Sequence, residues 1–183
     1  SFRVPNSLSP GSYTIRITID SKVLELPQKF TVLFDDSGNF RDSTLISDNL
    51  NGLEDIITSD VNNDGALDLI VAASEDGLIT VYLNNGNGVF GDGEQVANAS
   101  GVYRLVAGDI NGDSNNDIIY ASLDNNVIAW LPGKGDGTFL NKITLISNVS
   151  LPSALFLSDV DNDSDLDVLY TDENTDRGYI IIN

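Results

Sequence analysis

The 183-residue sequence contains no cysteine, histidine or methionine. Without thiol and imidazole groups it cannot form zinc fingers, thiolate metal sites, Cys–His nucleophiles or histidine general bases. The lack of cysteine identifies no compartment, because a secreted protein can be stabilised by metal ions in place of disulfides. Since the first residue is Ser1 and not methionine, we expect the chain to be a segment of a longer, processed protein.

Basic residues are also scarce, with 9 Lys and Arg against 28 Asp and Glu, and the formal net charge is −19. Nucleic acids and anionic lipids bind to positively charged surfaces, so these partners are excluded. No apolar run approaches the roughly 20 residues of a membrane-spanning helix, and no basic-then-apolar signal peptide opens the chain. We therefore expect cations as partners and no membrane span in this segment.

Acidic and amide side chains recur at fixed positions of a nine-residue segment, residues 60–68. Its positions 1, 3, 5 and 9 carry Asp or Asn, and position 6 is glycine. Ca²⁺ takes roughly six to eight oxygen ligands at about 2.3–2.6 Å, and this alternation lets a short turn supply several of them. The pattern recurs at residues 109–117 and 159–167. The sequence therefore predicts three calcium loops, and about three Ca²⁺ ions.

The predicted ligands are the side chains at positions 1, 3, 5 and 9 of each loop and the main-chain carbonyl at position 7. Gly65 suits the left-handed backbone expected at position 6, whereas Ser114 and Ser164 must adopt it at a cost of roughly 1 kcal/mol. The third loop offsets this cost with an additional carboxylate, Asp161, so we rank the first and third loops above the second in affinity. The predicted ligands are Asp60, Asn62, Asp64, Ala66 and Asp68; Asp109, Asn111, Asp113, Asn115 and Asp117; and Asp159, Asp161, Asp163, Asp165 and Asp167.

Two other interpretations of the loops were considered. Asp, Asn and Gly also form metal-free turns, but three clusters of carboxylates without a counterion would repel one another. An EF-hand requires a bidentate Glu at position 12 and flanking helices. Position 12 is instead Val71, Tyr120 or Tyr170, each inside an apolar run. The EF-hand is therefore excluded.

The loops begin at residues 60, 109 and 159, a period typical of propellers and solenoids. Phe40, Phe90 and Phe139 follow turn sequences with the same period and are expected to fill each unit's core. The middle copy predicts strands at residues 103–107, 117–121, 127–131 and 143–146, and Trp130 and Tyr82 are placed at nearly equivalent positions of third strands. No segment shows a helical period. We predict an all-β partial propeller of about three four-stranded blades, the last without its fourth strand.

Residues 1–33 lack both landmarks and are predicted to form a separate part. Strands are expected at residues 12–19, 23–26 and 30–34, after a turn at residues 10–11. This order is typical of the end of an immunoglobulin-like β-sandwich, and the alternative is a degenerate first blade. The predicted domains are therefore residues 1–33 and, for the propeller repeats, residues 34–183.

Two motifs resemble those of a known family. Asp-x-Asn-x-Asp-Gly-x-x-Asp at residues 60–68 with Leu-Ile-Val-Ala after it, and Gly-x-Gly-Asp-Gly-Thr-Phe at residues 133–139, resemble FG-GAP (VCBS-type) repeats, as in the integrin α-subunit propeller. The resemblance implies Ca²⁺ binding at the positions given above. Segments 126–130 and 165–169 resemble copies in secreted surface proteins of the Bacteroidota, which implies an extracellular, cell-surface location.

The first functional hypothesis is a non-catalytic, calcium-binding propeller segment of a large extracellular protein, acting as a scaffold or adhesion module. Its partners would be a protein or glycan at the cell surface, the rest of its own propeller, or a neighbouring chain. The alternative is a filament or sheath subunit that assembles through open blade edges. A propeller-type polysaccharide lyase or hydrolase is the third hypothesis, although the acids outside the loops share no register.

Overall fold

The computed structural model describes residues 11–19, 22–32 and 45–183, and it divides into two compact units, residues 1–44 and 45–183. In the first unit, β1 (Gly11–Ile19) pairs antiparallel with β2 (Lys22–Val32), with a register shift between Thr14 and Arg16. The prediction of separate strands at residues 23–26 and 30–34 is therefore wrong. Pro27 lies between Glu25 and Lys29, in the part of β2 where the register shifts, and proline is tolerated at such irregularities.

Several predictions fall outside the described residues. These are the beginning of the turn predicted at residues 10–11, the end of the strand predicted at residues 30–34, and the core position predicted for Phe40. The assignment of residues 1–33 to the end of an immunoglobulin-like domain stays a prediction.

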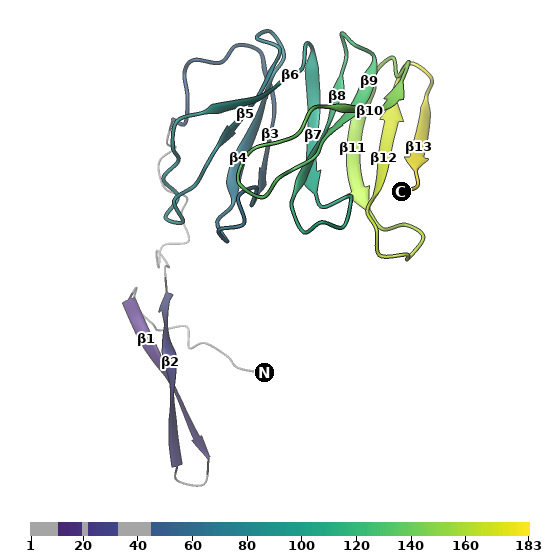
Figure 1. Ribbon diagram of the computed structural model, residues 1–183. Coiled ribbons are helices and arrows are strands. Elements are labelled where there is room, and N and C mark those ends of the chain that lie inside the picture. The colour runs from purple at the N-terminus through teal and green to yellow at the C-terminus, as the bar shows by residue number, and fades with distance from the viewer. Residues whose placement is uncertain (1–10, 20–21, 33–44) are drawn as a thin grey trace. The chain divides into compact units, whose positions relative to one another are not determined.

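The second unit consists of three antiparallel sheets, which we call blades 1, 2 and 3 (Figure 1). Blades 1 and 2 have four strands each, blade 3 has three, and each blade has the strand order of the chain. No helix occurs in the described part of the chain, and so none could cross a membrane. The predicted all-β, partial propeller with an incomplete third blade is confirmed. The strands are β3 (Leu53–Ser59), β4 (Asp68–Ala73), β5 (Leu78–Tyr82) and β6 (Glu94–Asn98); β7 (Val102–Gly108), β8 (Asp117–Ser122), β9 (Val127–Leu131) and β10 (Ile143–Ser147); and β11 (Pro152–Ser158), β12 (Asp167–Asp172) and β13 (Arg177–Ile181).

Hydrophobic residues of adjacent blades form the core. Ile70 and Val81 of blade 1 pack with Leu105 and Tyr120 of blade 2 in one buried cluster. A second cluster joins blades 2 and 3 in the same way. We call the face of a blade that packs on the next blade its trailing face, and the opposite face its leading face. Burying each aliphatic or aromatic side chain contributes about 1.5–3 kcal/mol, so blades stabilise one another.

Polar side chains also join the first strands of neighbouring blades. Asp55 of β3 accepts a hydrogen bond from the main-chain N–H of Leu105 in β7 through Oδ2, at 2.9 Å. Arg104, one repeat later, donates from Nε to the carbonyl of Ser153 in β11, at 3.1 Å. The third blade carries Ala154 at this position and has no such polar group. The link between blades is therefore supplied by two different side chains.

The aromatic residues singled out in the sequence do not all occupy equivalent places. Phe139 packs on the cluster between blades 1 and 2, as expected of a core residue. Trp130 pairs with Ile119 and faces blade 3, whereas Tyr82 pairs with Leu69 and lies on the leading face of blade 1. The repeat-equivalent of Tyr82 is Leu131. The near-equivalence of Trp130 and Tyr82 is therefore wrong, because a shift of one residue along a strand reverses the face.

Candidate metal centres

Each acidic loop joins the first and second strands of a blade. Loop 1 (residues 60–68) links β3 to β4, loop 2 (109–117) links β7 to β8, and loop 3 (159–167) links β11 to β12. The ninth residue of each loop is the first residue of the second strand. Position 12 lies inside that strand, which agrees with the exclusion of an EF-hand.

The ninth-position carboxylate is fully buried in every loop. In loop 2, Asp117 accepts hydrogen bonds from the main-chain N–H groups of Ile110 at 3.0 Å and Gly133 at 2.7 Å. Burial raises the pKa of Asp117, while the N–H groups of Gly133 and Ile110 oppose this rise. Asp68 and Asp167 accept the equivalent pair of N–H groups in their own loops. This carboxylate therefore closes the loop and anchors it to the third strand's end.

The acidic side chains at positions 1 and 5 accept hydrogen bonds from main-chain N–H groups of their own loop. Asp60, at position 1, accepts from the N–H of Asp64 at 3.2 Å and of Gly65 at 2.9 Å. Asp64, at position 5, accepts from the N–H of Ala66 at 2.8 Å. Loops 2 and 3 repeat these bonds. All three loops therefore share one frame of hydrogen bonds between side chains and the main chain.

The left-handed backbone predicted at position 6 is present in all three loops. Gly65 has φ of 85°, Ser114 of 68° and Ser164 of 80°. The two serines therefore bear the steric cost expected of a side chain in this region, roughly 1 kcal/mol each.

Loop 3 brings three carboxylates together. Oxygens of Asp159, Asp161 and Asp167 lie within 4.8 Å of one another. Two oxygens that each lie about 2.3–2.6 Å from one Ca²⁺ are separated by at most about 5 Å, so this spacing fits a shared ion. Among the described residues this is the only such trio of acids, and Asp163 at position 5 is not part of it.

Position 3 distinguishes loop 3 from the other two. In loops 1 and 2 it is Asn62 or Asn111, whose Nδ2 donates to the position-5 carboxylate at 2.9 or 3.0 Å. Asp161 cannot donate in this way. Desolvation, and then the negative charge of Asp163, raise the pKa of Asp161. Loop 3 therefore has one more carboxylate at its ligand positions than loops 1 and 2, and it lacks their amide hydrogen bond.

The chemistry of the donor set fits a hard cation. The side chains at positions 1, 3, 5 and 9 offer only carboxylate and amide oxygens, which are the ligands that Ca²⁺ prefers. The predicted residues of each loop are thus gathered in one turn, and the side chains at positions 1, 3 and 9 converge in loop 3. The roles of the carbonyls of Ala66, Asn115 and Asp165 stay predictions.

Hydrogen bonds from two asparagines that were not predicted as ligands, Asn63 and Asn116, connect loops 1 and 2. Asn63 Nδ2 donates to Asn115 Oδ1 at 2.9 Å, and Asn116 Nδ2 donates to the carbonyl of Asp60 at 2.7 Å. Asn116 stands at position 8, where the other loops carry Leu67 and Leu166. The polar residue at position 8 of loop 2 was the one feature of the sequence that could have indicated this contact. Loops 1 and 2 are therefore connected by two hydrogen bonds.

An open row of antiparallel blades, each with an acidic loop between its first two strands, defines a β-propeller repeat protein with candidate metal loops. The family model of the FG-GAP-like repeat matches residues 60–120 and 109–170, which together span more than half of the chain and include all three loops. The chain belongs to the FG-GAP-like repeat family. The resemblance inferred from the motifs is confirmed.

No curated protein matches the chain. Among solved structures, it is similar to a lectin from Agrocybe aegerita described as specifically recognising non-reducing terminal N-acetylglucosamine, at 22% identity and a TM-score of 0.49. The alignment covers 63% of this chain and 32% of the lectin chain. The chain thus spans about a third of the length of that lectin.

Proposed function

We propose that this chain is a calcium-stabilised, non-catalytic propeller segment of an extracellular protein, which acts as a scaffold or interaction module. The observation that carries the proposal is the convergence of Asp159, Asp161 and Asp167 in a loop whose hydrogen-bonded frame is repeated twice. One Ca²⁺ ion would be held by each loop. The ion would be structural, because it would connect the first two strands of a blade.

Charge neutralisation supports this role. The formal charge is −19, and three divalent ions add six positive charges, which leaves −13. The relief is concentrated in the loops, and in loop 3 oxygens of three carboxylates lie within 4.8 Å of one another. Since the oxygens converge only in the folded loop, the free energy of ion binding adds to the free energy of folding.

An extracellular location fits the chemistry of such sites. Extracellular modules bind Ca²⁺ with dissociation constants of about 10⁻⁴–10⁻³ M, which the surrounding calcium concentration fills. Outside the loops, Asp76 accepts hydrogen bonds from the main-chain and side-chain N–H groups of Asn51 and so stabilises the fold. We propose a protein or glycan as the partner, bound to the rigid surface that the metal loops maintain.

The test is thermal unfolding of the chain in excess EDTA and in about 2 mM Ca²⁺, a level above the range of weak extracellular sites. We expect calcium to stabilise the fold by on the order of 2 kcal/mol or more. Calorimetric titration should give three sites, and Asp60→Ala, Asp109→Ala and Asp159→Ala should each remove one. Absence of both bound calcium and a stability change would contradict the proposal.

The only tryptophan provides a local readout of loop 2. Trp130 is half-buried, and its indole N–H makes no hydrogen bond but lies near Asp117, where it partly offsets the rise that burial causes in the pKa of that carboxyl. We expect its fluorescence to change on calcium addition in the wild-type chain and in Asp159→Ala. The change should be lost in Asp109→Ala.

A further inference from the structure

One contact between loops 1 and 2 joins residues that are predicted to bind calcium. Asn116 donates from Nδ2 to the main-chain carbonyl of Asp60 at 2.7 Å, and both residues are half-buried. Asp60 is the ligand predicted at position 1 of loop 1. Asn116 stands between Asn115 and Asp117, the ligands predicted at positions 7 and 9 of loop 2. A single side chain therefore connects ligand residues of two candidate sites.

A second amide contact runs in the opposite direction. Asn63, at position 4 of loop 1, donates from Nδ2 to Asn115 Oδ1 at 2.9 Å. The backbone of Asn63 is left-handed, with φ of 59°, and Gly112 at position 4 of loop 2 has φ of 73°. Each loop therefore holds a ligand residue of the other loop through an amide donor.

The glycine-rich turn of residues 133–137 packs on this junction. An added Cβ on Gly135 would overlap the hydrogen-bonded amide groups of Asn63 and Asn115. The N–H of Gly137 donates to the main-chain carbonyl at position 2 of loop 1, at 3.0 Å. A shift of either loop would therefore disturb contacts that the other loop shares.

The two amide contacts cannot form between loops 2 and 3. Position 4 of loop 2 is Gly112, which has no side chain, and position 8 of loop 3 is Leu166, which has no donor. A different contact is present there, in which Asn183 donates from Nδ2 to the carbonyl of Ile110. Ile110 is not a predicted ligand. In the described part of the chain, hydrogen bonds therefore join a predicted ligand residue to a neighbouring loop only at loops 1 and 2.

We propose that Asn116 and Asn63 couple calcium binding at loops 1 and 2, so that an ion in either loop raises the affinity of the other. This inference rests on the proposed function, since it requires Ca²⁺ in both loops. An ion that orders residues 115–117 also orders the amide that holds Asp60. Loop 1 then loses less conformational freedom when it binds its own ion. Thermodynamic linkage makes the effect reciprocal.

Loop 2 gains most from this coupling. Ser114 bears the steric cost of a left-handed backbone, with φ of 68°, whereas Gly65 at the same position of loop 1 does not. Loop 1 should therefore bind its ion first and raise the affinity of loop 2. The pair should fill over a narrower range of calcium concentration than two independent sites of the same affinities would.

The test is a calcium titration of the full chain, followed by the fluorescence of Trp130 as the local readout of loop 2. Asp60→Ala removes the site in loop 1. We expect it to weaken calcium binding at loop 2 by about fivefold or more, the lower end of typical coupling between sites. Calorimetry of Asp159→Ala and of Asp60→Ala/Asp159→Ala gives the same comparison without the tryptophan.

A double-mutant cycle assigns the effect to the two asparagines. Asn63→Gly/Asn116→Leu, which we call the amide-free variant, carries residues that other loops have at the same positions. The effect of Asp60→Ala on loop 2 should be largely lost in the amide-free variant. Both backgrounds lose the same carboxylate, so the difference between them measures the contacts and not the charge.

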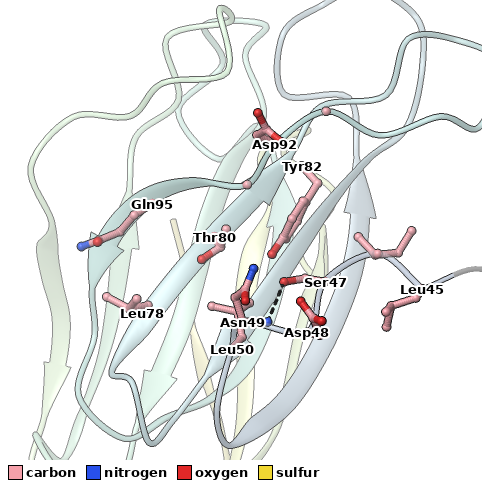
Figure 2. Close-up of a pocket in the computed structure, with 13 residues that line it drawn as sticks. Leu45, Ser47, Asp48, Asn49, Leu50, Leu78, Thr80, Tyr82, Asp92 and Gln95 are labelled. Carbon is pink, nitrogen blue, oxygen red and sulfur yellow. Dashed lines mark hydrogen bonds between the residues drawn. The ribbon is translucent and has the colours of Figure 1, made fainter.

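Gln95→Leu is the matched control. Gln95 lies in β6, at the border of the hollow between residues 45–50 and β5 (Figure 2), and its Nε2 donates to Asn98 Oδ1 at 3.0 Å. The substitution removes an exposed bond between two amides, like that of Asn63, outside loops 1 and 2. Coupling in this variant should equal that of the wild type.

Two results would overturn the inference. Equal loop 2 affinities in the wild type and in Asp60→Ala would show that the loops bind independently, and this comparison leaves both asparagines in place. An undiminished effect of Asp60→Ala in the amide-free variant, folded by near-ultraviolet circular dichroism, would assign the coupling to charge. Calcium still binds in both cases, so the proposed function would stand. Absence of bound calcium in the wild type would instead contradict the proposed function, and the coupling with it.

Discussion

At the scale of single residues, Asp117 combines a structural role with a predicted ligand role. Its two oxygens accept from buried N–H groups of Ile110 and Gly133. Asp117→Ala would leave these donors without partners, at about 1–3 kcal/mol for an unsatisfied buried donor. We expect this loss of unfolding free energy even in EDTA, where no ion contributes. Chemical denaturation of wild type and variant in EDTA measures it.

Asp113→Ala is the matched control in the same loop. Asp113 is exposed, and it accepts from the N–H of Asn115 through Oδ1 and from Asn111 Nδ2 through Oδ2. The control should lose calcium binding at loop 2 while retaining most of the stability in EDTA. Equal losses in EDTA for the two variants would contradict the distinction between the buried and the exposed carboxylate.

Asp161 sets the charge of loop 3. Desolvation and the neighbouring Asp163 carboxylate raise its pKa. Asp161→Asn should therefore stabilise the calcium-free protein, because the amide could donate to Asp163 as Asn62 and Asn111 donate in their loops. Calcium affinity of loop 3 should fall, on the order of tenfold, because ligand charge tunes affinity. Titration calorimetry and unfolding in EDTA measure the two effects, and Asn111→Asp should show the reverse.

At the scale of structural elements, the glycine-rich turn of residues 133–137 lies against two acidic loops. Gly137 donates its N–H to the carbonyl of Val61 at 3.0 Å, and an added Cβ on Gly133 would overlap the carbonyl oxygen of Asn116. Both contacts are with main-chain atoms, which cannot move aside as a flexible side chain can. The turn therefore fixes the spacing of loops 1 and 2.

Gly133→Ala should cost about 1–3 kcal/mol, the usual range for overpacking. It should also weaken calcium binding at loop 2, because the Gly133 N–H holds Asp117. Thermal unfolding and calcium titration measure these effects. Gly91→Ala is the control, since an added Cβ there meets only one atom at ordinary contact distance, 3.8 Å. If Gly133→Ala were as stable as the wild type, the turn would not be in close contact with loop 2.

The same scale shows what the sequence could predict. Loops and blades were predictable because Asp and Asn at positions 1, 3, 5 and 9 recur with apolar runs after them, and a periodic pattern specifies a periodic fold. Predicting which face of its sheet Trp130 or Tyr82 occupies required the exact strand register, since side chains along a strand alternate between the two faces. The polar links made by Asp55, Arg104 and Asn116 join residues about 50 positions apart. They follow no repeated pattern, so their hydrogen-bond partners are known only from the packed structure.

At the scale of the whole molecule, the net charge of −19 opposes compaction in the absence of cations. Much of this charge is concentrated in the three loops that join the first and second strands of the blades. Monovalent salt shortens the Debye length from about 10 Å at 0.1 M to about 3 Å at 1 M, and so screens repulsion between exposed loop carboxylates. Bound Ca²⁺ would neutralise the same carboxylates directly. The stabilisation by monovalent salt and the stabilisation by Ca²⁺ should therefore not be additive.

This argument predicts an interaction between salt and calcium in thermal unfolding. In EDTA, raising NaCl from about 0.1 M to about 1 M should stabilise the fold by about 1 kcal/mol, or about 2–4 °C for a chain of this length. In saturating calcium the same change should be clearly smaller. Choline chloride should reproduce the effect in EDTA, since screening does not depend on the identity of the monovalent cation. Equal salt effects with and without calcium would show that the destabilising repulsion lies between acidic side chains outside the loops. Calcium would then not act by relieving charge repulsion.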